Sequence, residues 1–268
     1  HEARMHGATI VAPCINTSTA LCEIKQKTIY LGLGMISELE QNVIKKLIAE
    51  RNLNGTYTDL YNFIKRTQIS VEQLRILIRV GAFQSINKNK KELLWEAHMF
   101  INPAKHDKNN SELFDVEPER YRLPKFENTW LDDALDEIEL LGFSLCSPFK
   151  LLKDKVKNTL LSRDLKKLQE KTVEIVGYLV NIKSTGTTKG EKMYFGTFLD
   201  IEGYWIDTVH FPPSARSFPF SGRGCYRIIG KVVNEFDHIY IDVSHQYRLP
   251  VINKDDEIKL EPQDPLIL

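Results

Sequence analysis

The sequence lacks an excess of charge of either sign, long hydrophobic runs and clustered cysteines. Lysine plus arginine and aspartate plus glutamate each total 36, so the zero net charge excludes a strongly basic nucleic-acid binder as a description of the whole chain. No run of about 18 apolar residues occurs, so we expect no membrane contact. The four cysteines lie far apart without Cys-x-x-Cys or Cys/His spacing, which predicts no zinc site and reduced thiols in a cytoplasmic protein.

Common catalytic signatures are missing as well. The sequence contains no GxxxxGKS/T phosphate loop, no HExxH or GxSxG motif and no Cys/His nucleophile pattern. The carboxylates within residues 132–139 lie opposite the apolar stripe of a predicted helix, and we interpret them as a solvated face rather than a metal site. We therefore predict no catalytic residue, metal or cofactor in this chain.

The C-terminal half contains five short runs of strand type, rich in β-branched and aromatic residues and separated by Gly, Pro and Asp. The expected strands cover residues 173–182, 193–199, 204–211, 225–233 and 239–243. Five strands with a longer connection between the third and fourth predict an OB-fold, a small barrel that binds single-stranded nucleic acid or oligosaccharide.

The preceding part of the chain carries helix patterns instead. Apolar periodicity and capping signals predict helices near residues 38–52, 58–66, 71–80 and 90–101. Short helices joined by tight hairpins, in tandem, are typical of a helix-hairpin-helix module, whose hairpin N–H groups point at a phosphate. The predicted fold class is therefore α+β and multidomain, with a tandem helix-hairpin-helix module followed by a five-stranded OB-fold β-barrel.

Composition shifts place the expected domain boundaries. The predicted segments are a short N-terminal region at 1–34, the helical module at 35–101, a polar linker at 102–128, connecting helices at 129–171, the barrel at 172–248 and a tail at 249–268. Because His1 opens inside a helical pattern that Gly7 ends, we expect the chain to be a piece of a longer polypeptide.

Two hairpins of the helical module differ as candidate phosphate sites. Around Gly81, which permits a sharp turn, the sequence gathers the cations Arg79, Lys88, Lys90 and Lys91. The alternative for this region is ordinary helix packing with solvated lysines. The other hairpin, residues 36–40, contains no glycine and two carboxylates that would repel a phosphate, so its contact with DNA is in doubt.

Two features of the barrel predict contact with a single strand. The first loop carries Lys183, Lys189 and Lys192, and the next two strands carry Phe195 and Trp205. If these aromatic rings are exposed, each provides a stacking platform worth about 1–3 kcal/mol per base. The alternative is that the rings fill the interior of the barrel.

An adjacent apolar pair, Leu113 and Phe114, stands in the polar linker. Such a pair is costly to leave in water, so we expect it either to fold back onto the domain or to anchor in a pocket of a partner protein.

Several segments agree in order and spacing with a known family. They are residues 7–16 with Ser18, 30–36, 74–83, 140–145, 176–177, 193–200, Gly203 and 211–212. With these segments the chain resembles the C-terminal part of the alpha subunit of bacterial DNA polymerase III, the C-family replicative polymerase, and most of all its Bacteroidetes-type branch. The resemblance covers nearly the whole chain.

The resemblance implies roles for each part. Residues 1–34 would end the fingers region, the helix-hairpin-helix module would grip primer–template duplex, and the OB barrel would meet single-stranded template. Leu113 and Phe114 match the end of an internal sliding-clamp-binding peptide, although Asn110 stands where Gln is usual. Other replisome subunits are implied as partners. The family's catalytic aspartates and Mg²⁺ lie in a palm domain with no counterpart here, so this chain alone should not polymerise DNA.

Two other readings stay open at this point. The zero net charge and the acidic hairpin favour a protein-interaction module that binds a sliding clamp and no nucleic acid. The barrel alone also fits an anticodon-type OB domain that binds RNA, against which the helical half argues.

Overall fold

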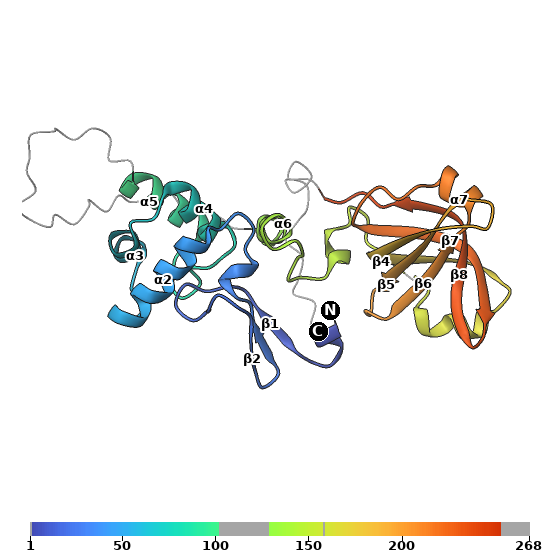
Figure 1. Cartoon of the computed structure of the whole chain (residues 1–268), viewed down its shortest axis with the longest axis horizontal. Coiled ribbons are helices and arrows are strands. Elements are labelled where there is room, and N and C mark those ends of the chain that lie inside the picture. The colour runs from blue at the N-terminus through green and yellow to red at the C-terminus, as the bar shows by residue number, and fades with distance from the viewer. Residues whose placement is uncertain (1, 102–128, 158, 253–268) are drawn as a thin grey trace, which may run out of the picture. The chain divides into compact units, whose positions relative to one another are not determined.

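The computed structural model describes residues 2–101, 129–157 and 159–252, and the chain divides into two compact units, His1–Leu145 and Cys146–Leu268. The first unit is mainly helical and the second contains a β-barrel (Figure 1). No helix in the described ranges is long and apolar enough to cross a membrane.

The helical unit begins with the short helix α1 (Glu2–Met5) and a three-stranded sheet. Strands β2 (Glu23–Lys25) and β3 (Thr28–Tyr30) form the hairpin expected from the sequence, and β1 (Thr9–Val11) pairs in parallel with β3. The sheet order is therefore β1-β3-β2.

The helices follow in the order that the sequence predicts. They are the 3₁₀ helix η1 (Leu33–Met35), α2 (Gln41–Asn54), α3 (Leu60–Thr67), α4 (Val71–Arg79), α5 (Lys90–Ile101) and α6 (Trp130–Leu141). The side chains of Ser70 and Thr129 accept hydrogen bonds from backbone N–H groups in the first turns of α4 and α6, as their N-cap positions predict. Gly142 ends α6 in the left-handed conformation.

Two local predictions in this unit are wrong. The Ser37–Glu40 capping box does not form, because this segment is a turn in which Glu38 has a φ of +63°, and α2 begins only after it. The segment around Gly81 is a long connection between α4 and α5 rather than a tight hairpin. The tight turn lies instead between α3 and α4, where Gln68 takes the left-handed conformation.

One continuous apolar core holds the helical unit together. Fully buried side chains from successive elements meet in it, among them Leu33, Ile44, Leu47, Leu60, Phe63, Leu74, Leu77 and Phe83. Leu140 and Leu141, at the end of α6, belong to the same core. Helix α6, expected to be a connecting helix, therefore packs as part of the helical unit.

The second unit is a closed five-stranded barrel. Its strands are β4 (Thr172–Gly186), β5 (Lys192–Leu199), β6 (Trp205–His210), β7 (Cys225–Glu235) and β8 (His238–Arg248). They follow one another in the order β4-β5-β6-β8-β7, and β7 pairs back with β4. Only β6 and β8 are parallel. This strand order is that of the OB-fold, so the predicted fold class is confirmed.

Smaller elements complete the second unit. The 3₁₀ helices η2 (Pro148–Leu151) and η3 (Ser162–Leu168) precede the barrel, and η3 replaces the α-helix expected there. The short helix α7 (Pro212–Ser217) lies in the connection between β6 and β7.

The interior of the barrel is tightly filled. Phe198, Ile206 and Tyr226 are buried in it with Ile228. A side chain at Gly196 would come within 2.7 Å of the hydroxyl of Thr208, so this inward-facing position admits only glycine.

Candidate nucleic-acid interface

Two tight turns lie next to each other in the helical unit. We call residues 36–40, before α2, hairpin one, and residues 68–70, before α4, hairpin two. Gln73 of α4, 7% exposed, accepts a hydrogen bond from the Glu40 N–H at 2.8 Å and donates one to the Glu38 carbonyl at 3.0 Å. Because Gln73 lies in the first turn of α4, which begins right after hairpin two, these bonds fasten the two hairpins together as a tandem pair.

A backbone N–H group of hairpin one is hydrogen-bonded within the helical unit. The backbone N–H of Ser37 donates to the carbonyl of Leu140 at the end of α6, with a distance of 2.7 Å between the two atoms. In a phosphate-binding hairpin such an amide points at the ligand. Here it is used for docking α6. The repulsion of DNA by the two carboxylates of hairpin one stays a prediction.

Arg79, predicted as a phosphate contact, lies at the end of α4 against α6. Its guanidinium is 2.7 Å from a carboxylate oxygen of Asp136 and 2.5 Å from one of Glu139. Its hydrogen bond to Glu139, assisted by Asp136, raises the pKa of Arg79 above its ordinary value. This cation is therefore part of an internal ion-pair network.

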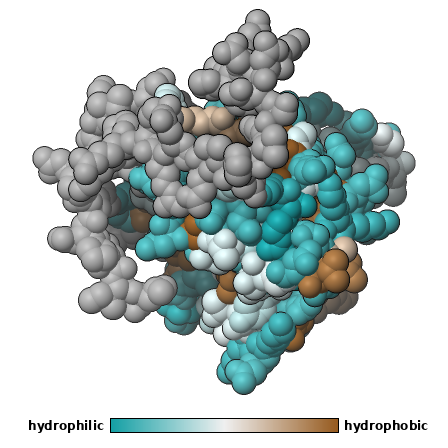
Figure 2. Space-filling model, turned by 90° about the vertical axis from the view of Figure 1, so that its left-hand side faces the viewer, coloured by the Kyte–Doolittle hydropathy of each residue, from teal (hydrophilic) through white to brown (hydrophobic). Residues whose placement is uncertain are grey.

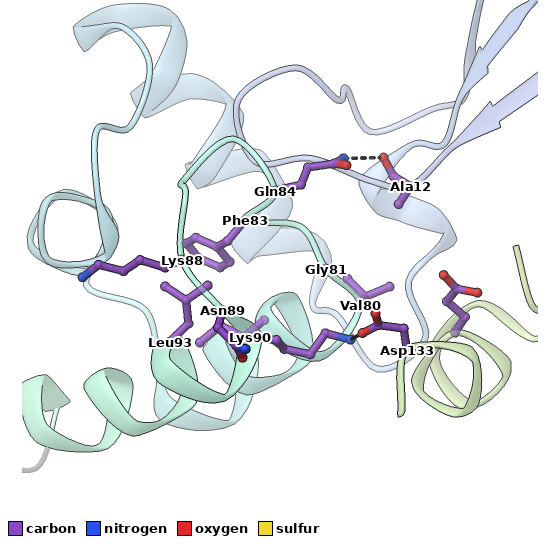
Figure 3. A pocket seen from close by; sticks show the side chains of 12 residues that line it. Ala12, Val80, Gly81, Phe83, Gln84, Lys88, Asn89, Lys90, Leu93 and Asp133 are labelled. Atoms are coloured by element: carbon purple, nitrogen blue, oxygen red, sulfur yellow. Dashed lines mark hydrogen bonds and ion pairs between the residues drawn. The ribbon is translucent and has the colours of Figure 1, made fainter. Parts of the chain in front are cut away.

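The three predicted lysines next to it are paired in the same way. The ion pairs are Lys88 with Glu96 at 2.5 Å, Lys90 with Asp133 at 2.5 Å and with Asp136 at 3.3 Å, and Lys91 with Asp132 at 3.3 Å. Figure 3 shows Lys90 reaching to Asp133 across a pocket of about 290 Å³, while Lys88 extends away from it. Gly81 lies in this pocket with a φ of +79°, as its turn role requires. The five residues stay a predicted DNA contact, but four of them would have to exchange carboxylates for phosphates.

Three other cations of the helical unit differ from these four. Lys45 and Lys46 are exposed near the start of α2, and Arg75 is exposed on α4; the structure gives none of the three an ion pair within the residues it describes. Sequence reasoning missed them because nothing local separates them from cations that are paired across the fold. Seen from the side of α3 and α5, the described surface is mainly hydrophilic, with small separate apolar patches (Figure 2).

The outer face of the barrel carries the predicted aromatic platforms. Phe195 on β5 is 42% exposed and Trp205 on β6 is 44% exposed, so neither ring fills the barrel. The aromatic side chains that do fill it are others, Phe198 and Tyr226. Along β5, alternation explains why Phe195 points outward and Phe198 inward, since successive side chains of a strand point to opposite faces. Along β6 the same alternation puts Trp205 outside and Ile206 inside.

The three predicted lysines lie together on the β4–β5 hairpin. Strands β4 and β5 are longer than expected, so Lys183 and Lys192 lie on strands, and only Lys189 lies in the connecting turn. Lys183 pairs directly opposite Phe195, which places both side chains on the same face of the sheet. All three lysines are exposed and have no ion-pair partner in the described part of the chain.

A groove of about 460 Å³ runs over β5, β6 and β8 on this outer face. Its lining includes Phe195, Thr197, Asp207, Phe211, His238 and Tyr240. Asp207 lies between a hydroxyl and an imidazole, with Thr197 Oγ1 at 3.3 Å and His238 Nε2 at 3.4 Å. The sequence could not place His238 and Tyr240 here, because the contact of β8 with β6 joins strands that are distant in the chain.

Two predictions remain, the clamp-binding pair and the expected lack of a metal site. Leu113 and Phe114 lie outside the described residues. Among the residues that are described, no group of three or more His, Cys, Asp or Glu is arranged to hold a metal ion.

Two adjacent hairpins in a helical unit and a barrel of OB topology define a helix-hairpin-helix and OB-fold protein. Residues 7–93 match the family model described as "Helix-hairpin-helix motif". The chain is 30% identical over 247 residues to the DNA polymerase III subunit alpha of Staphylococcus aureus (strain MSSA476), an alignment that covers 88% of this chain and 22% of that protein. It is 28% identical over 265 residues to the subunit of the same name from Borreliella burgdorferi, covering 90% of this chain and 23% of that protein.

An error-prone DNA polymerase of Mycobacterium bovis is 38% identical over 98 residues, covering 36% of this chain and 9% of that protein. The chain is thus similar over most of its length to part of the DNA polymerase III alpha subunit, and the resemblance found in the sequence is confirmed. It spans less than a quarter of the length of these relatives. Among solved structures, the second OB-fold domain of replication protein A from Methanococcus maripaludis aligns at 16% identity and a TM-score of 0.22, covering 32% of this chain and 88% of that one.

Proposed function

We propose that this chain is a non-catalytic, DNA-binding part of a cytoplasmic replicative polymerase, in which the barrel holds single-stranded template and the helical unit holds primer–template duplex. The observation that carries the proposal is the outer face of the barrel, where Phe195 and Trp205 are exposed and Phe195 pairs directly with the exposed Lys183. Aromatic rings for the bases and lysines for the phosphates are the two components of single-strand binding.

The proposed path of the single strand follows from the positions of these groups. Lys183 stands opposite Phe195 across β4 and β5, so a base stacked on the ring would bring its phosphate towards the ammonium group. Lys189 and Lys192 extend the positive charge along the same β-hairpin. Stacking is tolerant of sequence because every base offers a π face, which suits a template of any sequence.

Duplex binding by the helical unit is the weaker half of the proposal. The N-terminus of α4, next to hairpin two, favours an anion, and Lys45, Lys46 and Arg75 offer exposed positive charge. The predicted contacts of this unit also include Arg79, Gly81, Lys88, Lys90 and Lys91. The four cations among them bind phosphate only after they leave their carboxylate partners. We expect this unit to contribute less binding free energy than the barrel.

The test is fluorescence anisotropy of the whole chain with a labelled single strand, a duplex and a primer–template, at about 50 and about 200 mM salt. Three or four phosphate contacts should give a log–log salt slope of about −2 to −4. An unlabelled RNA competitor of the same sequence separates a DNA-binding barrel from an anticodon-type one. No binding to any DNA at low salt would refute the proposal.

One observation favours a second candidate function. Because Arg79, Lys90 and Lys91 are paired with carboxylates of the same unit, we also consider that the helical unit serves protein contacts instead. The partner proposed from the resemblance is a sliding clamp, bound through Leu113 and Phe114. A pull-down comparing the chain with its Phe114→Ala variant decides this: retention of the clamp by the wild type and its loss in the variant would support the interaction.

A further inference from the structure

The turn between β7 and β8 is built from unfavourable residues. Glu235 and His238 form the last strand pair, so Phe236 and Asp237 alone make the turn. Their φ angles are +52° and +64°, both in the left-handed region. A two-residue turn of this kind favours Asn-Gly, because these residues tolerate left-handed backbone, whereas a bulky aromatic residue is strained there.

The side chain of Phe236 gains nothing from the fold to offset this strain. It is 104% exposed, so none of the described residues covers the ring. The residue therefore has both a disfavoured backbone conformation and an apolar side chain in water. An uncompensated outlier of this kind indicates a role outside the stability of the folded chain.

The position of the turn points to that role. Glu235, His238 and Tyr240, which flank Phe236 along the chain, all line the groove on the outer face of the barrel. The rings of His238 and Tyr240 lie nearly parallel, with centroids 6.4 Å apart. The exposed ring thus stands at the end of a groove whose other members include Phe195 and Phe211.

We propose that Phe236 is a base-stacking residue, which holds one nucleobase of a single strand at the β7–β8 end of the groove. The inference rests on the proposed function of the barrel and adds a contact to it. The group held there is the base rather than the phosphate. Glu235 and Asp237, beside the ring, are negatively charged and repel a phosphate. The lysines of the β4–β5 hairpin hold the backbone further along the strand.

A single substitution tests the proposal by moving two properties in opposite directions. In Phe236→Asn the turn gains a residue that favours left-handed backbone, so the amides of β7 and β8 should exchange more slowly with deuterium. The same change removes the stacking ring, so affinity for a labelled oligonucleotide of about 16 nucleotides should fall at least about fivefold. Phe236→Trp should keep the affinity, because it keeps an aromatic face.

The matched control is Gln26→Asn, because Gln26 has a φ of +55° in the β2–β3 turn of the other unit. It should slow exchange locally and leave DNA affinity unchanged. If the wild type binds the oligonucleotide and Phe236→Asn binds it equally well, the stacking role is refuted while the proposed function stands. Loss of affinity together with faster exchange would also refute it, because the ring would then be structural. If the wild type does not bind the oligonucleotide, both the stacking role of Phe236 and the proposed function of the barrel are refuted.

Discussion

The cations predicted to contact DNA are arranged differently in the two units. In the helical unit, Arg79 and Lys90 lie within ion-pair distance of Asp136 on α6, so a carboxylate of the same unit neutralises much of their charge. In the barrel, Lys183 and its neighbours face solvent beside an exposed Phe195. The chain has no net charge, yet one surface keeps a basic and aromatic character. Net charge therefore says little about binding when the arrangement of charges differs between units.

The largest effect should come from reversing the charge of the barrel. Replacing Lys183, Lys189 and Lys192 by Glu should lower affinity for a single strand by roughly a hundredfold or more and flatten the salt slope by about 2. Anisotropy at two salt concentrations measures both. Duplex affinity should fall less.

In the matched variant, Glu replaces Lys88, Lys90 and Lys91, whose ion-pair partners are carboxylates of the same unit. It should change single-strand affinity by less than about threefold, because the barrel supplies that binding. Equal losses in the two triple variants would remove the contrast between the units.

The barrel also contains a buried histidine that should make its stability sensitive to acid. Burial lowers the pKa of His210 to about 4 from its ordinary value of 6.5. The unfolded chain takes up a proton at this residue as the pH falls through 6.5, but the folded barrel does not until about pH 4. The stability of the barrel should be complete above pH 6.5 and should fall by up to about 3 kcal/mol between these values.

Hydrogen exchange of the barrel strands at pH 7 and pH 5, corrected for intrinsic rates, measures this loss. His210→Phe keeps a ring against Phe220, whose centroid is 4.7 Å from that of His210, and removes the titrating group. The variant should lose less stability on acidification than the wild type. An equal loss in both would assign the acid sensitivity to other groups.

How far the sequence predicted these features depends on the range of the interactions. The starts of α4 and α6 were predictable because the N-cap bonds of Ser70 and Thr129 join residues three apart. The exposure of Phe195 and Trp205 was one of two open alternatives. The pairing of Arg79 with Asp136 was out of reach, since the two lie 57 residues apart with a non-periodic linker between them.

The failure at Ser37 has the same physical cause. Its local spacing to Glu40 fits a capping box, but a bond to Leu140, far along the chain, holds its N–H elsewhere. The position of β8 beside β6, and hence half of the groove, likewise follows from closure of the barrel rather than from either strand alone. Phe236 escaped notice because its strain is a backbone property that composition does not reveal.

A third experiment concerns the fastening of the two hairpins in the helical unit. Gln73→Ala leaves the N–H of Glu40 and the carbonyl of Glu38 without their side-chain partner in a partly buried place. The helical unit should lose about 2 kcal/mol of stability, and duplex affinity should fall while single-strand affinity does not change. Glu72→Ala, at an exposed neighbouring position, is the control for changing α4 itself.

The smallest effect should come from neutralising the carboxylates of α6. In the double variant Asp133→Asn, Asp136→Asn, the cations Arg79 and Lys90 lose two of their ion-pair partners. Because these pairs are only partly buried, stability should fall by about 1 kcal/mol or less. The released positive charge should raise duplex affinity about two- to fivefold, and the gain should shrink as salt rises. If duplex affinity stays level while the helical unit remains folded, the α4–α5 side takes no part in DNA binding. The duplex would then have to be held at hairpin two, with Lys45, Lys46 and Arg75.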